Sequence, residues 1–149
     1  QLMDLYNEHQ ASVVALEQVL ESKVSRYGIM DGTEVTPGVY RINDLIEKPS
    51  IEQAPSNFAF AGRYIFQPDI FDYLAQAERG KNNEIQLTDA MRAMAVSRPM
   101  FGCEFEGERH DIGNTLDFIK TNIHYALKAP ELRNEIVAYM KYSLSKIEP

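Results

Sequence analysis

Glu47, Lys48 and Pro49 are adjacent residues whose side chains suit the binding of a phosphorylated sugar. A carboxylate accepts hydrogen bonds from sugar hydroxyls, and a neighbouring ammonium neutralises a phosphate as a point charge. The proline fixes the backbone directly after them. The three residues stand between a predicted strand and a predicted loop, where ligands bind in open α/β sheets. An exposed ion pair before a turn would have the same sequence, so this tripeptide leaves both interpretations open.

Two glycines lie where a ligand could approach the main chain. Gly28 begins a predicted strand, and its missing side chain leaves the backbone N–H and C=O open to a hydroxyl, although a simple bend would also use glycine. Gly62 follows Ala61 inside a predicted apolar strand, which indicates a bulge, a close backbone approach or a ligand wall. Arg63 then pairs either with an acidic residue or with a substrate, and the spacing does not choose between them.

Asp111 is the candidate metal ligand, because it lies between a predicted strand and a predicted helix. A carboxylate there can coordinate Mg²⁺ bound to phosphates, since Mg²⁺ sites often take only one or two protein carboxylates. The same residue could instead belong to the cap of the helix that begins near Asn114. His9, His110 and His124 lack the spacing of two histidines one helical turn apart, so they predict no metal site.

The composition fits a globular protein and excludes some partners. The chain has 149 residues, of which 44% are hydrophobic and 25% charged, enough for one domain with a sizeable core. Fifteen Lys and Arg against twenty-two Asp and Glu give a net charge of -7, which argues against nucleic acid or an anionic membrane surface as a partner.

The cysteine count and the termini give further expectations. Cys103 is the only cysteine, so no intrachain disulfide forms; we expect it to pack as a small hydrophobe in a cytoplasmic protein. No signal peptide and no apolar run of about 20 residues is present. The chain begins at Gln1 without a methionine, and we expect a truncated or processed product.

Hydrophobic periodicity predicts an α/β layered sheet that positions these residues. Turns are expected at Asp31-Gly32 and Pro37-Gly38, and a loop over residues 48–57. The predicted strands cover residues 12–19, a short stretch around 28, 39–46, 58–66 and, half-buried by alternation, 101–105. The predicted helices cover residues 2–9, 68–80, 87–95, 114–127 and 130–144. Residues 84–89 are expected to cap and brace a helix entrance.

In this order and spacing, six short blocks resemble the sugar-phosphate half of bacterial UTP-glucose-1-phosphate uridylyltransferases. The resemblance runs from near Gln1 to about Leu132. The blocks are Ser25-Arg26-Tyr27-Gly28-Ile29, Glu47-Lys48-Pro49, Ala54-Pro55-Ser56-Asn57, Gly62-Arg63-Tyr64-Ile65, Glu84-Ile85-Gln86-Leu87-Thr88-Asp89-Ala90 and Asp111-Ile112-Gly113.

The resemblance implies part of a Rossmann-like nucleotide-diphospho-sugar transferase fold, an α/β fold with a mixed sheet flanked by helices. It implies that residues 1–149 form the C-terminal part of one nucleotidyltransferase domain, without the N-terminal nucleotide-binding portion. Residues 1–113 would be the sugar-phosphate-binding sheet region and 114–149 the C-terminal helices. The implied reaction joins UTP and glucose 1-phosphate to give UDP-glucose and pyrophosphate by in-line, Mg²⁺-assisted attack.

The resemblance also implies a role for each matching residue. Lys48 would hold the phosphate of glucose 1-phosphate, and Glu47 would bind the glucose hydroxyls. Gly28 would make main-chain contacts to the sugar. Asp111 would be one of two Mg²⁺ aspartates and, with Lys48, a catalytic residue. Ala61 and Gly62 would line the sugar face, although the family usually has valine at position 61; it often has tyrosine and cysteine where His110 and Ile112 flank the aspartate.

The family's glycine-rich nucleotide loop precedes the region that this chain resembles. We therefore expect the chain alone not to make UDP-glucose. Two alternatives remain: a thymidylyltransferase relative, and a noncatalytic assembly or binding module that pairs through an apolar helical stripe. That stripe comprises Leu132, Ile136, Met140 and Leu144. The expected partners are glucose 1-phosphate, UTP or UDP-glucose, and further copies of the chain in a homo-oligomer.

Overall fold

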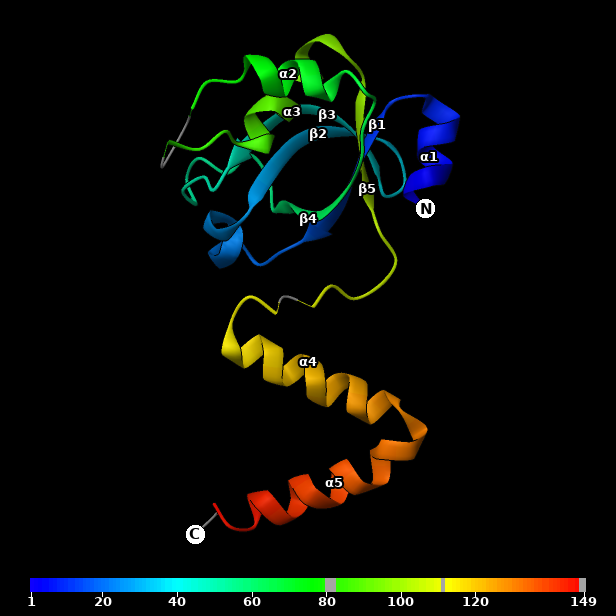
Figure 1. The fold of residues 1–149 in the computed structure, drawn as a ribbon, viewed down its shortest axis with the longest axis vertical. Coiled ribbons are helices and arrows are strands. Elements are labelled where there is room, and N and C mark those ends of the chain that lie inside the picture. The colour runs from blue at the N-terminus through cyan, green and yellow to red at the C-terminus, as the bar shows by residue number, and fades with distance from the viewer. Residues whose placement is uncertain (80–82, 111, 148–149) are drawn as a thin grey trace. The chain divides into compact units, whose positions relative to one another are not determined.

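The computed structural model describes residues 1–79, 83–110 and 112–147. The chain forms two compact units, Gln1–Glu106 and Gly107–Pro149 (Figure 1). The first unit holds the sheet, and the second holds the two C-terminal helices. The predicted division of the domain near residue 113 stays a prediction.

A five-stranded mixed sheet that closes on itself forms the first unit. Its strands are β1 (Ser12–Gln18), β2 (Gly28–Thr36), β3 (Val39–Glu47), β4 (Phe58–Ile65) and β5 (Met100–Glu104). Around the ring the order is β1-β4-β2-β3-β5. β1 pairs with β5 in parallel and every other described pair is antiparallel, so the predicted mixed sheet is confirmed.

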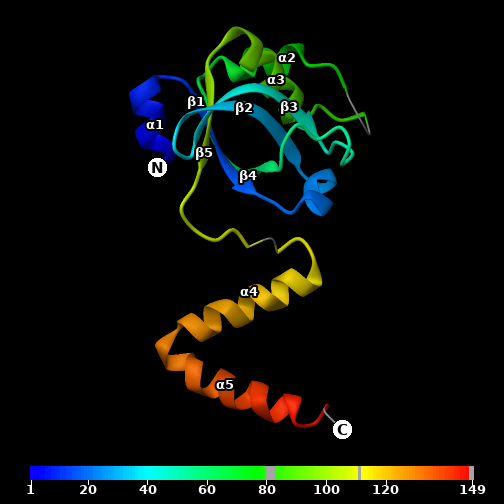
Figure 2. The same ribbon diagram turned by 180° about the vertical axis from the view of Figure 1, so that it is seen from behind.

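Helices flank this sheet, as predicted. They are α1 (Leu2–His9), the 3₁₀-helix η1 (Glu21–Arg26), α2 (Ile70–Gln76) and α3 (Leu87–Ser97). Both views show α2 and α3 together on one side of the sheet and α1 beside β1 (Figures 1 and 2). Met91 and Met94 of α3 are fully buried in the same hydrophobic core as Leu16 of β1 and Ile42 of β3.

Local sequence signals placed one turn correctly and another wrongly. The turn at Pro37-Gly38 is confirmed, with Gly38 at a φ of 74°. The predicted turn at Asp31-Gly32 is wrong, because β2 continues through it to Thr36 and only its pairing with β3 is irregular there. A Cβ on Gly32 would lie 2.7 Å from the carbonyl oxygen of Arg41, so this glycine serves a close backbone approach.

β5 differs from its predicted half-buried pattern, because Met100 through Cys103 are all buried. The strand lies between β1 and β3, and a Cβ on Gly102 would meet Leu16 at 2.3 Å. The Cys103 side chain packs as a small hydrophobe, as predicted, and is a free thiol. Burial raises the pKa of this thiol.

The second unit is a V-shaped pair of helices, α4 (Thr115–Lys128) and α5 (Pro130–Leu144), joined at Ala129. Asn114 caps the helix that was predicted to begin near it, since the Asp117 N–H donates to Asn114 Oδ1 at 2.9 Å. Pro130 begins α5, as predicted. Neither helix contains a buried residue within the part of the chain described.

No helix in residues 1–79, 83–110 and 112–147 has the length and apolar character to cross a membrane.

Candidate functional site

Gly28 and Glu47 face each other across the β2–β3 pair, at the start of one strand and the end of the other. A Cβ on residue 28 would lie 2.8 Å from Glu47 Oε2 and 2.6 Å from the Phe60 ring. Both distances are shorter than real Cβ contacts allow, so Gly28 makes room for the carboxylate and the ring. The glycine therefore accommodates a close approach of side chains, and not only a bend.

Thr88 holds the Glu47 carboxylate from the first turn of α3. Its hydroxyl Oγ1 donates to Glu47 Oε2 at 2.7 Å. Thr88 is buried, and the Glu47 side chain is 28% exposed, so the second oxygen, Oε1, faces a partly open environment. The predicted bracing role of residues 84–89 is thus met by Thr88, whereas the N-cap residue of α3, Gln86, makes no side-chain cap bond.

Lys48 adopts an unusual backbone conformation beside this carboxylate. Its φ of 48° lies in the left-handed region, which costs a residue with a side chain about 1 kcal/mol. The Lys48 N–H donates to the Tyr27 carbonyl at 3.0 Å, which anchors the strained residue to the chain before β2. Its side chain is 55% exposed and its Nζ lies 3.7 Å from Glu47 Oε1, so this surface ion pair contributes little stability and leaves the charge accessible.

A hollow of about 320 Å³ opens beside these residues. Its lining residues are Leu45, Ile46, Glu47, Lys48, Glu84, Gln86, Asp89 and Arg92. Arg92 already binds Asp44 through two hydrogen bonds of 2.6 and 2.8 Å. Partial burial acts to raise the pKa of Asp44, but the bonds from Arg92 and from the Leu45 N–H lower it overall. Lys48, whose contact with Glu47 is longer, is therefore the lining cation less engaged by a carboxylate.

Aromatic side chains of β4 complete the surroundings of Glu47. Burial raises the pKa of Tyr64, and the negative charge of Glu47 raises it further, so the phenol lies within electrostatic reach of the carboxylate. The Tyr64 ring stacks on Phe66 with centroids 5.4 Å apart. Phe60, which is buried in the core, lies beside Gly28, so two aromatic residues of β4 lie near Glu47.

Ala61 and Gly62 lie on β4 between Phe60 and Tyr64. The pairing of β4 with β1 is irregular there, between Val14 and Leu16, and Gly62 has a φ of 68°. A Cβ on Gly62 would meet no heavy atom within 4 Å, so the residue is an exposed bulge glycine. Arg63 turns its Nη1 back onto the Gly62 carbonyl at 3.0 Å.

The structure therefore brings Gly28, Glu47 and Lys48 together. Ala61 and Gly62 lie on β4, the strand that also carries Phe60 and Tyr64. Asp111, the predicted metal ligand and catalytic residue, lies outside the described residues.

The sequence reasoning did not find Thr88 and Tyr64 as neighbours of Glu47. A sequence signal for Tyr64 was Gly62 within β4. A bulge at this glycine changes which residues of the strand share a face with Phe60. No local pattern indicates that Thr88 reaches a strand 41 residues away.

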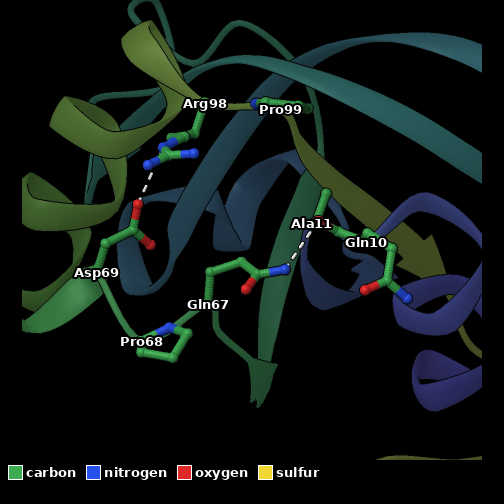
Figure 3. A pocket seen from close by; sticks show the side chains of 7 residues that line it. All are labelled: Gln10, Ala11, Gln67, Pro68, Asp69, Arg98 and Pro99. Atoms are coloured by element: carbon green, nitrogen blue, oxygen red, sulfur yellow. Dashed lines mark hydrogen bonds and ion pairs between the residues drawn. The ribbon is translucent and has the colours of Figure 1, made fainter.

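A second hollow, of about 530 Å³, lies at the start of β1 and contains none of the predicted site residues (Figure 3). Its lining residues are Gln10, Ala11, Gln67, Pro68, Asp69, Arg98 and Pro99. Two contacts cross it: Arg98 Nε lies 3.0 Å from Asp69 Oδ2, and Gln67 Nε2 donates to the Gln10 carbonyl at 2.8 Å.

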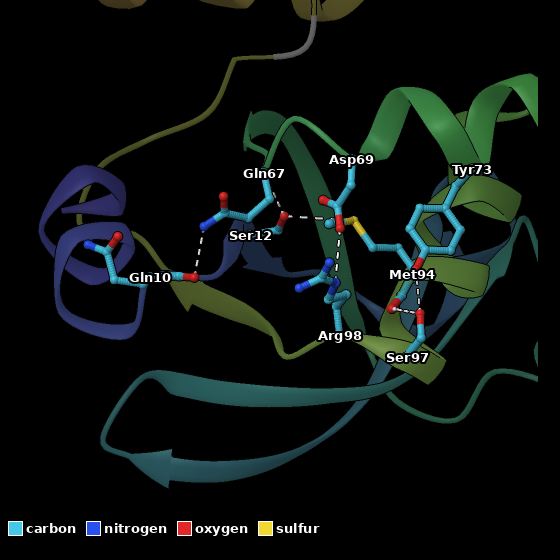
Figure 4. A network of polar contacts seen from close by, with 8 residues as sticks. All are labelled: Gln10, Ser12, Gln67, Asp69, Tyr73, Met94, Ser97 and Arg98. Carbon is cyan, nitrogen blue, oxygen red and sulfur yellow. Dashed lines mark hydrogen bonds and ion pairs between the residues drawn. The ribbon is translucent and has the colours of Figure 1, made fainter.

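The polar groups around this second hollow mainly form hydrogen bonds and ion pairs with one another (Figure 4). The Gln67 N–H donates to Ser12 Oγ at 2.9 Å, and Ser12 is bonded onward to Met94 Sδ at 3.8 Å. Tyr73 and Ser97 share a hydroxyl hydrogen bond. These contacts tie α2 and α3 to the start of β1, which is a structural role.

The mixed sheet, its flanking helices and the carboxylate–lysine pair at a strand end define an α/β protein with a candidate ligand site at the end of β3. The family model described as nucleotidyl transferase matches residues 1–128, and the chain belongs to this family. Nucleotidyl transferases generally use a divalent metal ion.

The chain is similar to curated uridylyltransferases of staphylococci. It is 45% identical over 141 residues to the UTP–glucose-1-phosphate uridylyltransferase of Staphylococcus haemolyticus, covering 95% of this chain and 49% of that protein. The Staphylococcus epidermidis protein of the same name is 44% identical over the same length. The predicted resemblance is confirmed, and the chain spans about half the length of the curated relatives it matches.

Solved structures agree with the fold. A UDP-glucose pyrophosphorylase complexed with UDP-glucose aligns with a TM-score of 0.84 at 44% identity, covering 87% of this chain and 49% of that one. A UTP-bound enzyme from Acinetobacter baumannii gives a TM-score of 0.80 at 29% identity, over 93% and 48% of the two chains. The predicted fold class is confirmed by this agreement.

Proposed function

We propose that this chain supplies the sugar-phosphate side of an enzyme that makes UDP-glucose and pyrophosphate from UTP and glucose 1-phosphate. The observation that carries the proposal is the Glu47 carboxylate, which Thr88 holds in place opposite Gly28 and next to the accessible ammonium of Lys48. A sugar phosphate needs this combination of an acceptor for hydroxyls and a cation for phosphate.

Each residue has one task in this proposal. Glu47 accepts hydrogen bonds from glucose hydroxyls, and Thr88 keeps the carboxylate oriented so that little ordering is needed on binding. The Gly28 backbone contacts the sugar, and Tyr64, which is only partly buried, provides an apolar surface for its ring, with Ala61 and Gly62 on the same strand. Lys48 holds the phosphate group.

The proposed chemistry is an in-line attack of the sugar-phosphate oxygen on the α-phosphorus of UTP. Pyrophosphate leaves with the bonding electrons, and no covalent intermediate with the protein forms. Lys48 is catalytic in the sense that it neutralises and positions the attacking phosphate. Mg²⁺, when bound, would supply further charge neutralisation; its assignment to Asp111 is supported by the family resemblance alone.

The staphylococcal relatives favour uridylyl over thymidylyl transfer. The chain is 44–45% identical to uridylyltransferases, whereas a putative glucose-1-phosphate thymidylyltransferase from Bacillus anthracis is 20% identical with a TM-score of 0.63. That second likeness concerns the fold alone.

We also propose a cytoplasmic location, because Cys103 is a buried free thiol, which is usual in a reducing compartment.

The exposed apolar side chains of the second unit support a role in assembly, and we propose a second copy of the chain as the partner. Neither α4 nor α5 buries a residue among those described. The exposed apolar side chains are Ile112, Leu116, Phe118, Ile119, Tyr125, Leu132, Tyr139, Tyr142, Leu144 and Ile147. Sedimentation velocity tests this: the chain should form a dimer or larger oligomer that Leu132→Glu dissociates, and a monomeric wild type would contradict it.

Calorimetric titration of the chain with glucose 1-phosphate tests the proposed site. We expect saturable binding that Lys48→Ala removes and that Lys23→Ala, an exposed lysine of η1, leaves unchanged. Equal binding by both variants, or none by the wild type, would contradict the site. In a pyrophosphate-release assay with UTP and Mg²⁺, the chain alone should not turn over, because it spans about half of its relatives.

A further inference from the structure

Glu108, His110 and His124 come together within the second unit, although they are not one helical turn apart in the sequence. One ligand atom from each residue lies within 4.8 Å of the other two. Glu108 Oε2 is 3.1 Å from His124 Nε2 and 4.0 Å from His110 Nε2. The two imidazole centroids are 4.6 Å apart, with their planes inclined at 50°. The segment before α4 therefore folds back onto the middle of that helix.

The surroundings of His124 leave its Nε2 atom available as a metal ligand. Its Nε2 atom is buried and makes no hydrogen bond within the described residues, despite its short distance from the Glu108 carboxylate. A buried polar nitrogen without a hydrogen bond is costly, and a metal ion would use its lone pair. Tyr125 packs against both imidazoles, with centroids 5.2 and 5.3 Å away, and restricts their rotation.

We propose that Glu108, His110 and His124 bind a divalent transition-metal ion of the Zn²⁺ type. Two imidazole nitrogens and one carboxylate oxygen are a donor set that Zn²⁺ and Co²⁺ accept, with water at the fourth position, whereas Mg²⁺ prefers oxygen ligands. Tetrahedral coordination at about 2.0–2.1 Å needs ligand atoms about 3.4 Å apart. The separations of 3.1 and 4.0 Å lie on either side of that value.

Closing the site requires only small side-chain movements. No pair of ligand atoms is more than 4.8 Å apart, so contraction on the order of 1 Å completes the tetrahedron. The Glu108 side chain is 65% exposed, while the two histidines are more than two-thirds buried at 21% and 28% exposure. The ion would fasten the segment that precedes α4 to the helix itself, and so stabilise this unit.

Lys128 is the natural competitor for the metal. Its ammonium lies 3.4 Å from Glu108 Oε2, one helical turn beyond His124. If Glu108 serves only to pair with this cation, the histidines bind no metal. If the three residues form a metal site, removing Lys128 leaves every ligand in place and strengthens binding, because a competing positive charge is gone.

Visible absorption of Co²⁺ added to the tag-free chain tests the proposal. We expect one Co²⁺ per chain with the intense bands of tetrahedral coordination, displaced by Zn²⁺ but not by excess Mg²⁺, and a higher Tm with Zn²⁺. His110→Ala and His124→Ala should each weaken binding at least about tenfold. His9→Ala is the matched control, because His9 is the remaining histidine and stacks on Phe101 in the first unit.

Lys128→Gln keeps all three ligands, so it tests the site without removing a donor. It should bind Co²⁺ at least as tightly as the wild type. Glu108→Gln should weaken binding and keep the far-UV circular dichroism of the wild type, which separates ligand loss from unfolding. No stoichiometric Co²⁺ binding, displacement by Mg²⁺, or equal loss in His9→Ala and His124→Ala would overturn the proposal.

Discussion

Thr88 Oγ1 donates a 2.7 Å hydrogen bond to Glu47 Oε2, and this bond joins the first turn of α3 to the last residue of β3. A hydrogen bond to a charged group is worth about 1.5–3 kcal/mol when it is well shielded. Glu47 is partly exposed, so we expect this bond to contribute less, about 1 kcal/mol. The bond sets the direction of the carboxylate before any ligand arrives.

Thr88→Val should therefore weaken glucose 1-phosphate binding more than it weakens the fold. Valine has nearly the same shape but no hydroxyl, so Glu47 loses its donor and becomes free to rotate. We expect a loss of about 1 kcal/mol in stability by urea unfolding and a binding loss of roughly tenfold by calorimetry. Thr36→Val, at an exposed strand end, is the control and should change neither. Unaltered binding in Thr88→Val would remove this bond from the site.

Gly28→Ala should disturb the same site sterically. The added methyl group would stand 2.6 Å from the Phe60 ring and 2.8 Å from Glu47 Oε2. Overpacking of this kind costs about 1–3 kcal/mol, measurable as a lower urea midpoint, and it displaces the carboxylate. Gly38→Ala is the comparison: its φ of 74° makes alanine strained, but the new Cβ has 3.8 Å of clearance. We expect Gly38→Ala to reduce stability and keep binding, and equal binding by the two variants would contradict the proposed role of Gly28.

Lys48→Gly should separate stability from function at one position. Glycine adopts a φ of 48° without strain, so the variant should be more stable than Lys48→Ala by about 1 kcal/mol in urea unfolding. Both variants lack the ammonium, so both should lose glucose 1-phosphate binding. Retained binding in Lys48→Gly would show that the backbone at this position, and not the charge, recognises the ligand.

The Asp44–Arg92 pair predicts how stability depends on acid. Arg92 and the Leu45 N–H hold the pKa of Asp44 below its ordinary value of 3.8, against the opposing effect of burial. The folded chain thus binds this proton less readily than the unfolded chain, so the pair stabilises the fold above pH 3.8. That contribution is lost as the pH falls through the lowered pKa. Arg92→Gln should flatten this acid dependence in urea titrations, and an unchanged slope would count against the pair.

Much of the fold follows from local sequence signals. The Asn114 cap, the Pro130 helix start and the turn at Pro37-Gly38 each depend on residues within one turn, and all three are confirmed. Asp31-Gly32 carries a similar turn signal, but pairing with β3 overrides it. The closure of the sheet, with β5 inserted between β1 and β3, depends on contacts far apart in the chain, which no local pattern specifies.

The candidate site divides in the same way. Glu47, Lys48 and Gly28 were predicted from motif and resemblance, and the β2–β3 register brings them together. Thr88 could not be predicted as the partner of Glu47, because that contact depends on how α3 packs against β3. The spacing rule for histidines likewise failed to find His110 and His124, because their approach depends on a fold-back before α4.

The burial of Cys103 gives the first unit an internal probe of its own motions. The residue is the only thiol in the chain, and it is covered within β5 between β1 and β3. A thiol reagent can reach it only when β5 detaches, so the labelling rate measures how often the closed sheet opens. Comparing that rate with and without glucose 1-phosphate would report whether occupation of the Glu47 site slows opening of a strand that contributes no residue to it.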